Sequence, residues 1–228
     1  EIGGVPVIVR TVRAFLAVAE IDMVYVGIKP DWHEYTNELF ERFEIDSRRV
    51  KVIDGGADRN GTVMNIAEAI VAEHGKNEGD IILTHDAVRP FVTEAMREHS
   101  ACGTYMPAAD TIIRSDGEKV RETLNRSELY QAQTPQTFRF GDLRRNYYSL
   151  SEEQKKKLTD TCSVFTACNE DIYLVVGDAL NFKITTDSDL KMANALAELN
   201  EKQIKAVSEN DLCTAFFYTL PCFMLFSA

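Results

Sequence analysis

Residues 79–91 read "GDIILTHDAVRPF", an apolar run that ends in a histidine, an aspartate, an arginine and a proline. The aliphatic first part is typical of a buried strand. Charged residues at the end of a buried strand are unusual unless that end reaches the surface. In an open parallel sheet, ligands bind beyond the carboxyl ends of the strands. The stretch therefore predicts a central strand whose end, at Asp86, lies in a binding site.

The chain around this strand alternates between two periodicities. β-Branched runs predict strands, and apolar residues at helical spacing predict helices. We expect strands at 21–28, 48–56, 79–86 and 171–176, helices at 5–18, 32–43, 59–75, 141–158 and 159–170, and a closing helix within 181–199. Alternation of this kind indicates an α/β fold, a Rossmann-like and mostly parallel sheet with helices on both faces. Asp187 or Ser188 is expected to cap the last helix.

The pattern changes after Pro107. Residues 108–139 contain short β-like pieces around "SDGE" (115–118), a good hairpin turn, and too few apolar residues for a second core. We interpret them as a β-arm projecting from one domain at 1–200. Residues 201–228 form a tail of unknown role. Its apolar end, "LCTAFFYTLPCFMLFSA", is short for a membrane span, so we favour a buried or artefactual tail over an interfacial anchor.

Charge and cysteine usage exclude several classes of protein. The 228 residues carry a formal net charge of −11, with a pI near 4.9, whereas a nucleic-acid binder needs a basic face. The five cysteines form no C-x-x-C pair and do not cluster with the four histidines. We therefore expect reduced thiols in a cytoplasmic protein, with no nucleic-acid partner and no membrane association.

Two predicted strand ends carry residues suited to a ligand. Gly55 and Gly56 let backbone approach a ligand closely before a helix N-terminus, although a plain strand-to-helix turn explains two glycines equally well. Asp86 could hold Mg²⁺ or a sugar hydroxyl, and the planar guanidinium of Arg89 could reach a phosphate. Alternatively, Asp86 and Arg89 pair with each other, or Asp86 caps a helix that begins near Thr93.

Other polar residues stand out less. Arg126 lies in the arm and Lys183 lies just before the last helix; lone cations of this kind are usually solvated surface. Thr159 and Asp160 are ordinarily a helix cap. Their spacing alone assigns no chemistry to any of them.

An ordered set of motifs links these residues to a known family. The motifs are "GGADRNGTV" (55–63), "THDAVRPFVT" (84–93), "ADTI" (109–112), "NRSELYQAQTPQTFR" (125–139), "LTDTCSVF" (158–165) and "NFKITTDSDLKMANAL" (181–196). Over residues 1–199 the chain resembles the cytidylyltransferases of sugar and polyol phosphates. Trp32 and residues 147–160 are more similar to the ribitol-5-phosphate branch of teichoic-acid synthesis than to the methylerythritol-4-phosphate branch of isoprenoid synthesis.

The resemblance implies transfer of CMP from CTP to a polyol phosphate with release of pyrophosphate. D-Ribitol 5-phosphate, which would give CDP-ribitol, is the expected acceptor, and 2-C-methyl-D-erythritol 4-phosphate is the alternative. A non-catalytic nucleotide-binding or dimerisation module is the second alternative. Mg²⁺ or another divalent cation is the implied cofactor, with Asp86 as a candidate ligand.

The resemblance also assigns residues. It implies catalytic cations at Arg126 and Lys183, substrate contacts at Asp86, Arg89, Thr134 and Thr159, and a nucleotide site at Gly55, Gly56, Ala57, Asp58, Arg59, Asn60, Gly61, Thr62 and Ala87. Thr62 takes the place of a hydroxyl residue near the cytosine. The arm is implied to cross to a second subunit, so that Arg126 and Thr134 complete the neighbour's site in a homodimer.

One departure from the family pattern concerns the start of the chain. The family begins with a strand, a glycine-rich loop and a Pro-Lys-Gln segment. The loop bears an arginine and wraps the triphosphate. The sequence "EIGGVPVIVRTV" resembles the stretch immediately after this segment. We therefore expect weak CTP binding and very little turnover from the chain as written.

Overall fold

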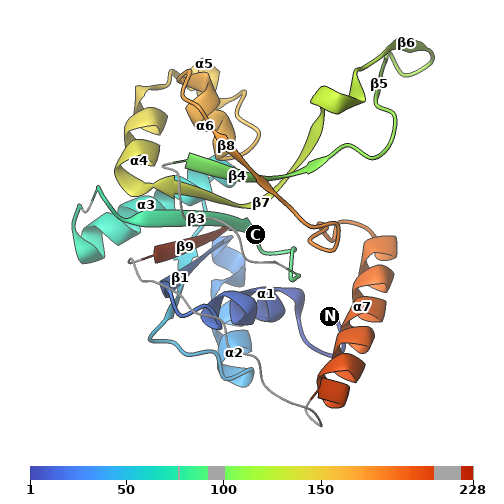
Figure 1. The fold of residues 1–228 in the computed structure, drawn as a ribbon. Helices are drawn as coiled ribbons and strands as arrows, with labels where there is room; N and C mark the ends of the chain where they lie inside the picture. The colour runs from blue at the N-terminus through green and yellow to red at the C-terminus, as the bar shows by residue number, and fades with distance from the viewer. Residues whose placement is uncertain (77, 92–100, 208–221, 228) are drawn as a thin grey trace.

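The structure is a computed structural model that describes residues 1–76, 78–91, 101–207 and 222–227. A seven-stranded sheet forms its centre, in the order β2-β1-β9-β3-β7-β4-β8 (Figure 1). Its strands are β1 (Ile21–Ile28), β2 (Val50–Asp54), β3 (Ile81–Asp86), β4 (Ala101–Pro107), β7 (Tyr130–Arg139), β8 (Tyr173–Val176) and β9 (Cys222–Ser227). Every neighbouring pair is parallel except those of β7, which is antiparallel to β3 and β4. The predicted α/β fold with a mostly parallel sheet is confirmed.

Helices cover both faces of this sheet, as predicted. The helices of the described residues are α1 (Val7–Leu16), α2 (His33–Arg42), α3 (Arg59–His74), α4 (Phe140–Ser149), α5 (Glu152–Lys155), α6 (Cys162–Ala167) and α7 (Asp187–Val207), with short 3-10 turns η1 (Pro30–Trp32) and η2 (Arg126–Glu128), and α7 stands beside the sheet (Figure 1). Successive side chains of a strand point to opposite faces, so β1 shows the layering directly. Tyr25 packs with α3 and α4, whereas Val24 and Val26 pack with α1 and α2.

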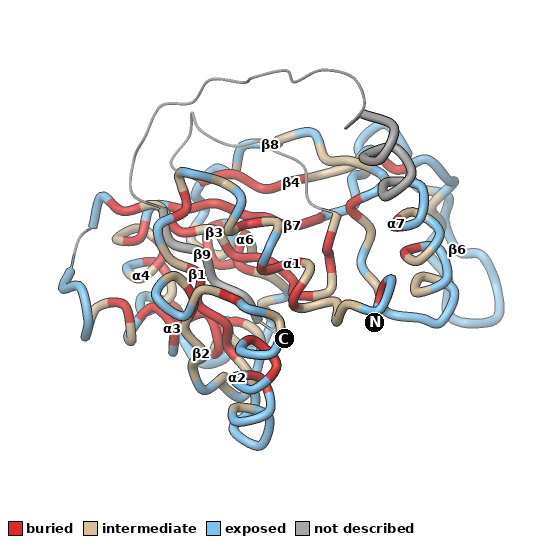
Figure 2. Tube along the Cα trace, turned by 90° about the horizontal axis from the view of Figure 1, so that it is seen from below, coloured by how far each residue is buried: buried red, intermediate tan, exposed pale blue. Residues whose placement is uncertain are grey.

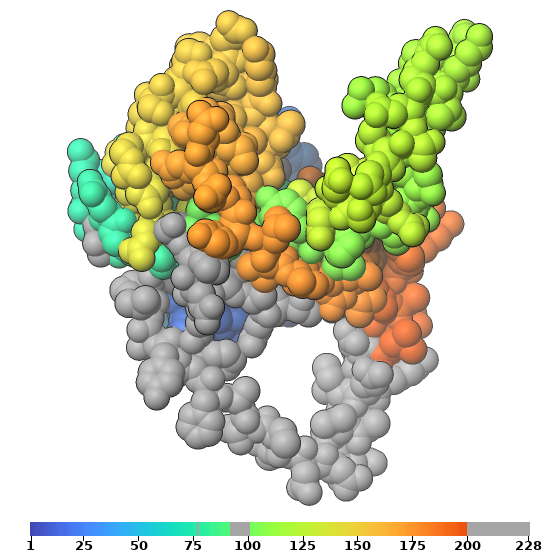
Figure 3. Space-filling model, turned by 45° about the horizontal axis from the view of Figure 1, so that its top comes forward, coloured from blue at the N-terminus to red at the C-terminus, as the bar shows by residue number. Residues whose placement is uncertain are grey.

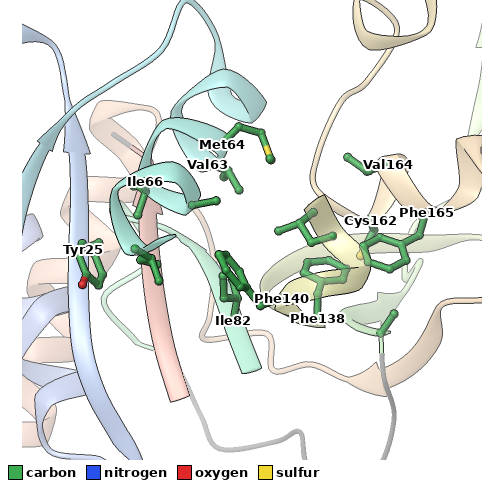
Figure 4. Close-up of a cluster of buried hydrophobic side chains, with 14 of the residues drawn as sticks. Tyr25, Val63, Met64, Ile66, Ile82, Phe138, Phe140, Cys162, Val164 and Phe165 are labelled. Carbon is green, nitrogen blue, oxygen red and sulfur yellow. The ribbon is translucent and has the colours of Figure 1, made fainter. Parts of the chain in front are cut away.

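The larger core lies on the α3 side of the sheet (Figure 4). There Phe138 of β7 stacks on Phe165 of α6, with ring centroids 4.7 Å apart, and Ile82 of β3 and Phe140 of α4 join them. Buried residues are concentrated along these central strands, whereas the residues of the arm are mostly exposed (Figure 2). Ile82 of β3 packs in this core and Leu83 packs against the core on the other face, so β3, which ends at Asp86, is held between the two.

Helix ends follow the expected chemistry in most places. Asp58 caps α3 by accepting from the Gly61 amide at 2.7 Å, and Gly75, with φ 80°, ends the helix as predicted. The cap of α7 is Thr186, one residue earlier than predicted. Its hydroxyl accepts from the Asp189 amide at 3.2 Å while the Asp189 carboxylate accepts from the Thr186 amide at 2.8 Å. This reciprocal pair satisfies two otherwise free N–H groups, which neither Asp187 nor Ser188 does.

The predicted β-arm stands away from the body (Figure 3). Its hairpin consists of β5 (Ile113–Ser115) and β6 (Val120–Thr123), with Gly117 in the turn at φ 101°. The arm is shorter than the predicted 108–139, because residues from Tyr130 onward form β7 of the central sheet. The run 133–138 is buried although most of its residues are polar, so its sequence did not indicate a central strand.

The C-terminal tail contributes a central strand. Residues up to Val207 continue α7, so no boundary falls at 201. β9 pairs in parallel with β1 on one side and β3 on the other, and Ser227 lies opposite both Gly27 and Asp86. Residues 222–227 are therefore part of the central sheet, which agrees with a buried tail and not with an interfacial anchor. The apolar segment 212–221 lies outside the described residues. Among the described residues, no helix is long and apolar enough to cross a membrane.

Candidate active site

Asp86, the last residue of β3, lies at the centre of a cluster of cations. The residue is only 7% exposed. Its Oδ2 lies 3.2 Å from Nε of Arg89 and 3.3 Å from Nζ of Lys183, and its Oδ1 lies 3.4 Å from Nε of Arg59. The pairing of Asp86 with Arg89 was one of the alternatives left open by the sequence. The structure shows that pair and adds two further cations to it.

The cluster carries more positive than negative charge. One carboxylate faces three cationic side chains, which leaves an excess of two positive charges. Burial alone would raise the pKa of the Asp86 carboxyl, but Arg59, Lys183 and Arg89 outweigh this effect and hold its pKa below the ordinary value. Asp86 therefore stays ionised and orients its partners, and the remaining charge suits an anionic ligand.

The three cations come from three separate segments of the chain. Arg59 is the first residue of α3, Arg89 follows β3, and Lys183 lies in the loop before α7. Arg59 is held from behind, because its Nη1 donates to the hydroxyl of Thr161 at 3.0 Å. Thr161 is fully buried and was missed by the sequence analysis, which assigned the neighbouring Thr159 instead. Thr159 is exposed, and its backbone amide bonds to the hydroxyl of Ser163 at 3.1 Å.

A pocket of about 370 Å³ opens beside the cation cluster. Its wall includes the side chains of Arg89 and Lys183 together with Gln133 of β7 and Phe182. The base of the arm also contributes, through Pro107 and Ala109. The pocket therefore combines two cations with an apolar wall, which suits a small molecule that has a phosphate at one end.

Arg126 lies next to this pocket rather than on Asp86. It is exposed, and its Nη1 donates to the carbonyl of Ala109, a pocket residue, at 2.8 Å. Thr134, by contrast, is 4% exposed, and its hydroxyl accepts from the backbone amide of Asp86 in the same chain at 3.1 Å. The expectation that Thr134 reaches a neighbour's site is thus replaced by a contact within its own chain, because Thr134 belongs to β7 and not to the arm.

The glycine stretch forms a tight loop at the end of β2. Gly55 donates to the carbonyl of Ile28 at 2.7 Å, which joins the ends of β1 and β2. A Cβ at Gly56 would lie 2.4 Å from the carbonyl carbon of Gly61, so only glycine fits there. Thr62 closes the loop, since its hydroxyl accepts from the Gly56 amide at 2.9 Å and donates to the Asp58 carbonyl at 3.0 Å.

These contacts show which of the predicted nucleotide-binding residues are exposed and which are engaged within the protein. The hydroxyl of Thr62 is used within the loop, and Arg59 turns toward Asp86, so neither is presented freely as the resemblance implied. Ala57 and Asp58 are exposed, and Asn60 is 7% exposed. The carbonyl of Ala87 accepts from the hydroxyl of Thr11 at 2.7 Å. The loop therefore offers an exposed rim at 57–58 above a rigid base.

Asp86 does not fit the role of a metal ligand. Both of its oxygens already face cationic side chains at 3.2–3.4 Å, and a divalent cation would be repelled by them. Within the described ranges, no group of three or more His, Cys, Asp or Glu side chains could hold a metal ion. We therefore assign no metal to Asp86.

Burial also makes a thiol nucleophile unsuitable near this edge. Cys162 at the start of α6 is 3% exposed, and burial raises the pKa of its thiol to about 12. A thiolate, the reactive form, is therefore scarce at neutral pH. The chemistry of the edge is that of fixed charges rather than of a covalent intermediate.

A Rossmann-like sheet with a glycine loop and a cation cluster at one edge defines a class of proteins that bind nucleotides and other phosphates. Comparison with known proteins specifies the class. Residues 1–199 match the family model "IspD: 2-C-methyl-D-erythritol 4-phosphate cytidylyltransferase". The chain therefore belongs to this family of cytidylyltransferases and is an enzyme of that kind.

Solved structures agree with the family match. The 4-diphosphocytidyl-2C-methyl-D-erythritol synthase from Anaerococcus prevotii is 27% identical, with a TM-score of 0.71, over 87% of this chain and 88% of that one. The cytidylyltransferase from Thermus thermophilus is 27% identical, with a TM-score of 0.70, over 87% and 91%. The enzyme from Francisella tularensis is 25% identical, with a TM-score of 0.72, over 85% and 88%.

Proposed function

We propose that the protein transfers CMP from CTP to 2-C-methyl-D-erythritol 4-phosphate, releasing pyrophosphate. The observation that carries the proposal is the set of three cations around Asp86, beside a pocket that Arg89 and Lys183 line. The reaction brings two anions together, because an oxygen of the polyol phosphate attacks the α-phosphorus of CTP. Fixed positive charge at the meeting point lowers the energy of that encounter and of the transition state.

Lys183 and Arg89 are the groups best placed to hold the polyol phosphate. Lys183 is 44% exposed at its side chain, so its ammonium can leave Asp86 for a ligand, whereas Arg89 is 10% exposed and stays in place. The attacking phosphate oxygen is already ionised at neutral pH, so the step needs no general base. The new P–O bond forms as the bond to pyrophosphate breaks, and the cations offset the charge that spreads over the phosphoryl oxygens.

The loop of residues 55–62 is the proposed seat of the cytidine nucleotide. It follows the carboxyl end of β2 and includes the first turn of the 16-residue helix α3. That end of a helix presents amide N–H groups and a partial positive charge to a phosphate. Ala57 and Asp58 form the exposed rim that a base would contact. Any divalent cation would enter with the phosphates of CTP, since the described side chains do not build a site for it.

We further propose a homodimer formed through the arm. The hairpin presents Ile113 and Val120, which are 45% and 61% exposed, on a part of the chain that touches little of its own body (Figure 3). Apolar side chains on a projecting hairpin are costly in water unless another surface covers them. A partner subunit would cover them, and Arg126 at the base of the arm would then lie at the interface.

The acceptor is assigned on the comparisons. The matching family model and the related structures carry the name of the methylerythritol enzyme. The rival is D-ribitol 5-phosphate, which the stretch 147–160 and Trp32 favour. Trp32 is 54% exposed and contacts Tyr35 edge-on, with ring centroids 5.6 Å apart.

A parallel assay tests the proposal. The protein is incubated with Mg²⁺, with CTP or UTP, and with either polyol phosphate, and both pyrophosphate and the nucleotide product are measured. With CTP and methylerythritol phosphate we expect slow release of pyrophosphate and formation of a cytidine diphosphate product, in keeping with the low turnover expected of the chain as written. Faster turnover with ribitol phosphate would overturn the choice of acceptor, and no product with either acceptor would overturn the function.

A further inference from the structure

The loop between β8 and α7, which carries Lys183, is docked on β7 by buried amides. Asn181 is 2% exposed, and its Nδ2 donates to the carbonyl of Thr134 at 2.8 Å and to Oε1 of Gln133 at 3.4 Å. Gln133 in turn donates through Nε2 to the carbonyl of Asp178 at 2.9 Å. The loop also approaches β7 closely at Gly177, where a Cβ would lie 2.4 Å from Oε1 of Gln133.

The hydrogen-bond pattern fixes the orientation of both amides. Because Nε2 of Gln133 must face the carbonyl of Asp178, Oε1 of Gln133 faces Asn181. Two acceptors, this oxygen and the carbonyl of Thr134, then surround the amide of Asn181. A reversed Asn181 would place oxygen against oxygen at both contacts, so the donor must point toward β7.

Asn181 is connected to three members of the cation cluster, Asp86, Arg89 and Lys183. Its backbone carbonyl accepts from Nη1 of Arg89 at 2.7 Å. Its side chain holds Thr134, whose hydroxyl accepts from the Asp86 amide at 3.1 Å. Lys183 follows two residues along the same loop and reaches Asp86 at 3.3 Å. One residue thus links the backbone of Asp86 with both cations that line the pocket.

We propose that Asn181 is a positioning residue, which sets Lys183 and Arg89 at the distances from Asp86 that the bound phosphate requires. The inference rests on the proposed function, because it assumes that these two cations hold the acceptor's phosphate. Asn181 does not itself reach the reacting atoms.

The unused oxygen of Asn181 supports a role in positioning rather than in packing. Oδ1 is buried and has no hydrogen-bond partner among the described residues. A buried acceptor without a partner costs stability, and an apolar side chain of similar size would avoid that cost. The amide at this position therefore supplies something other than stability, namely the donor that fixes the loop to Thr134.

The first test measures the effect of Lys183 and Arg89 on Asp86 and does not require catalytic activity. The pKa of the Asp86 carboxyl is followed by ¹³C NMR titration in the wild-type protein, in Asn181→Ala and in Asn146→Ala. Asn146 of α4 is the matched control, since it is 4% exposed and also has an unpartnered amide atom, Nδ2. We expect the pKa of Asp86 to rise in Asn181→Ala, because Lys183 and Arg89 move away, and to stay unchanged in Asn146→Ala. An unchanged pKa in folded Asn181→Ala overturns the proposal.

The second test is a double-mutant cycle on turnover. We expect Asn181→Ala to lower kcat by about 10-fold to 100-fold, the effect of leaving one buried polar group without its partner, with the KM for CTP unchanged. In a Lys183→Ala background the same change should lower kcat by a smaller factor than in the wild-type protein, because only Arg89 is then left for Asn181 to position. Equal losses in both backgrounds contradict the proposal.

The proposal can still be tested if the wild-type protein is inactive or if Asn181→Ala does not fold. If the wild-type protein releases no pyrophosphate, the proposed function fails, whereas the titration of Asp86 still decides the role of Asn181. If Asn181→Ala does not fold, Asn181→Ser takes its place in the titration. Serine keeps a hydroxyl donor on a shorter side chain, so the pKa of Asp86 should still rise, and an unchanged value overturns the proposal.

Discussion

Nζ of Lys183 lies 3.3 Å from Oδ2 of Asp86, and this contact joins the last loop of the domain to the end of its central strand. Asp86 is buried, while the side chain of Lys183 is 44% exposed. The carboxylate therefore serves as a fixed anchor, and the ammonium is available to a ligand. The proposed chemistry depends on this difference in exposure.

Replacing Lys183 tests that availability. We predict that Lys183→Ala lowers kcat by about 10²–10³-fold, because one preorganised charge is lost from the transition state. The KM for CTP should change little, since the nucleotide loop lies on other elements. Lys191→Ala is the matched control, as Lys191 is exposed on α7. Steady-state kinetics of pyrophosphate release check the prediction, and equal effects of the two changes would contradict it.

The arm provides a prediction about assembly. If the proposed dimer forms through the arm, Ile113→Glu with Val120→Glu should convert it to a monomer, because two charges replace exposed apolar side chains on the hairpin. Analytical ultracentrifugation measures the outcome. Val176→Glu is the control, since Val176 of β8 is 81% exposed and lies outside the arm. A dimer that survives the arm substitutions would rule out this interface.

The glycine loop yields a prediction about fit. Gly56→Ala should destabilise the protein by about 1–3 kcal/mol and weaken CTP binding, because its Cβ would meet the backbone of Gly61 and Thr62 at 2.4–2.6 Å. At Gly61 the nearest atom is Oδ1 of Asp58, at 3.3 Å, so Gly61→Ala should be tolerated better. Urea unfolding and calorimetric titration with CTP compare the two, and a milder effect of Gly56→Ala would refute the steric argument.

Burial of His85 predicts a dependence of stability on pH. Burial lowers the pKa of His85 from 6.5 to about 4, and its Nε2 lies 2.9 Å from the carbonyl of Arg89. Between these values the unfolded chain binds a proton that the native protein does not, so stability must fall as the pH falls. The loss should reach about 2 kcal/mol between pH 7 and pH 5.

Urea unfolding at both pH values measures this loss. In His85→Gln it should nearly disappear, whereas His33→Gln, which removes a partly exposed histidine, should retain it. The lowered pKa of Asp86 acts in a separate window, because its contribution is lost only as the pH falls below the ordinary carboxyl range. A slope that is unchanged in His85→Gln would contradict the assignment to His85.

Periodicity made much of the fold predictable. Strands such as Ile21–Ile28 are buried on both faces, and their continuous apolar runs are distinctive. β7 was not recognised as a sheet strand, because its buried segment contains Gln133, Thr134, Gln136 and Thr137, whose polar groups can be satisfied by contacts distant in sequence. The pairing of β9 joins residues from opposite ends of the chain, which no local pattern reveals.

The candidate site was predictable only in part. The end of β3 was identified because charge at a strand end is unusual, and the pairing of Asp86 with Arg89 involves close neighbours in sequence. Thr161 and Asn181 were missed, because each acts through a partner that only the tertiary structure supplies. Arg126 and Thr134 belong to the same motif, yet one lies on the exposed arm and the other is buried beside Asp86.

The account's central claim is that two phosphate compounds meet at the edge of the sheet that Asp86 marks. A crystal structure with a non-hydrolysable CTP analogue and methylerythritol phosphate tests it most directly. We predict the cytidine over residues 55–62 and the acceptor's phosphate within hydrogen-bonding distance of Lys183 and Arg89. Both ligands bound at another edge, or a phosphate away from these two cations, would contradict it.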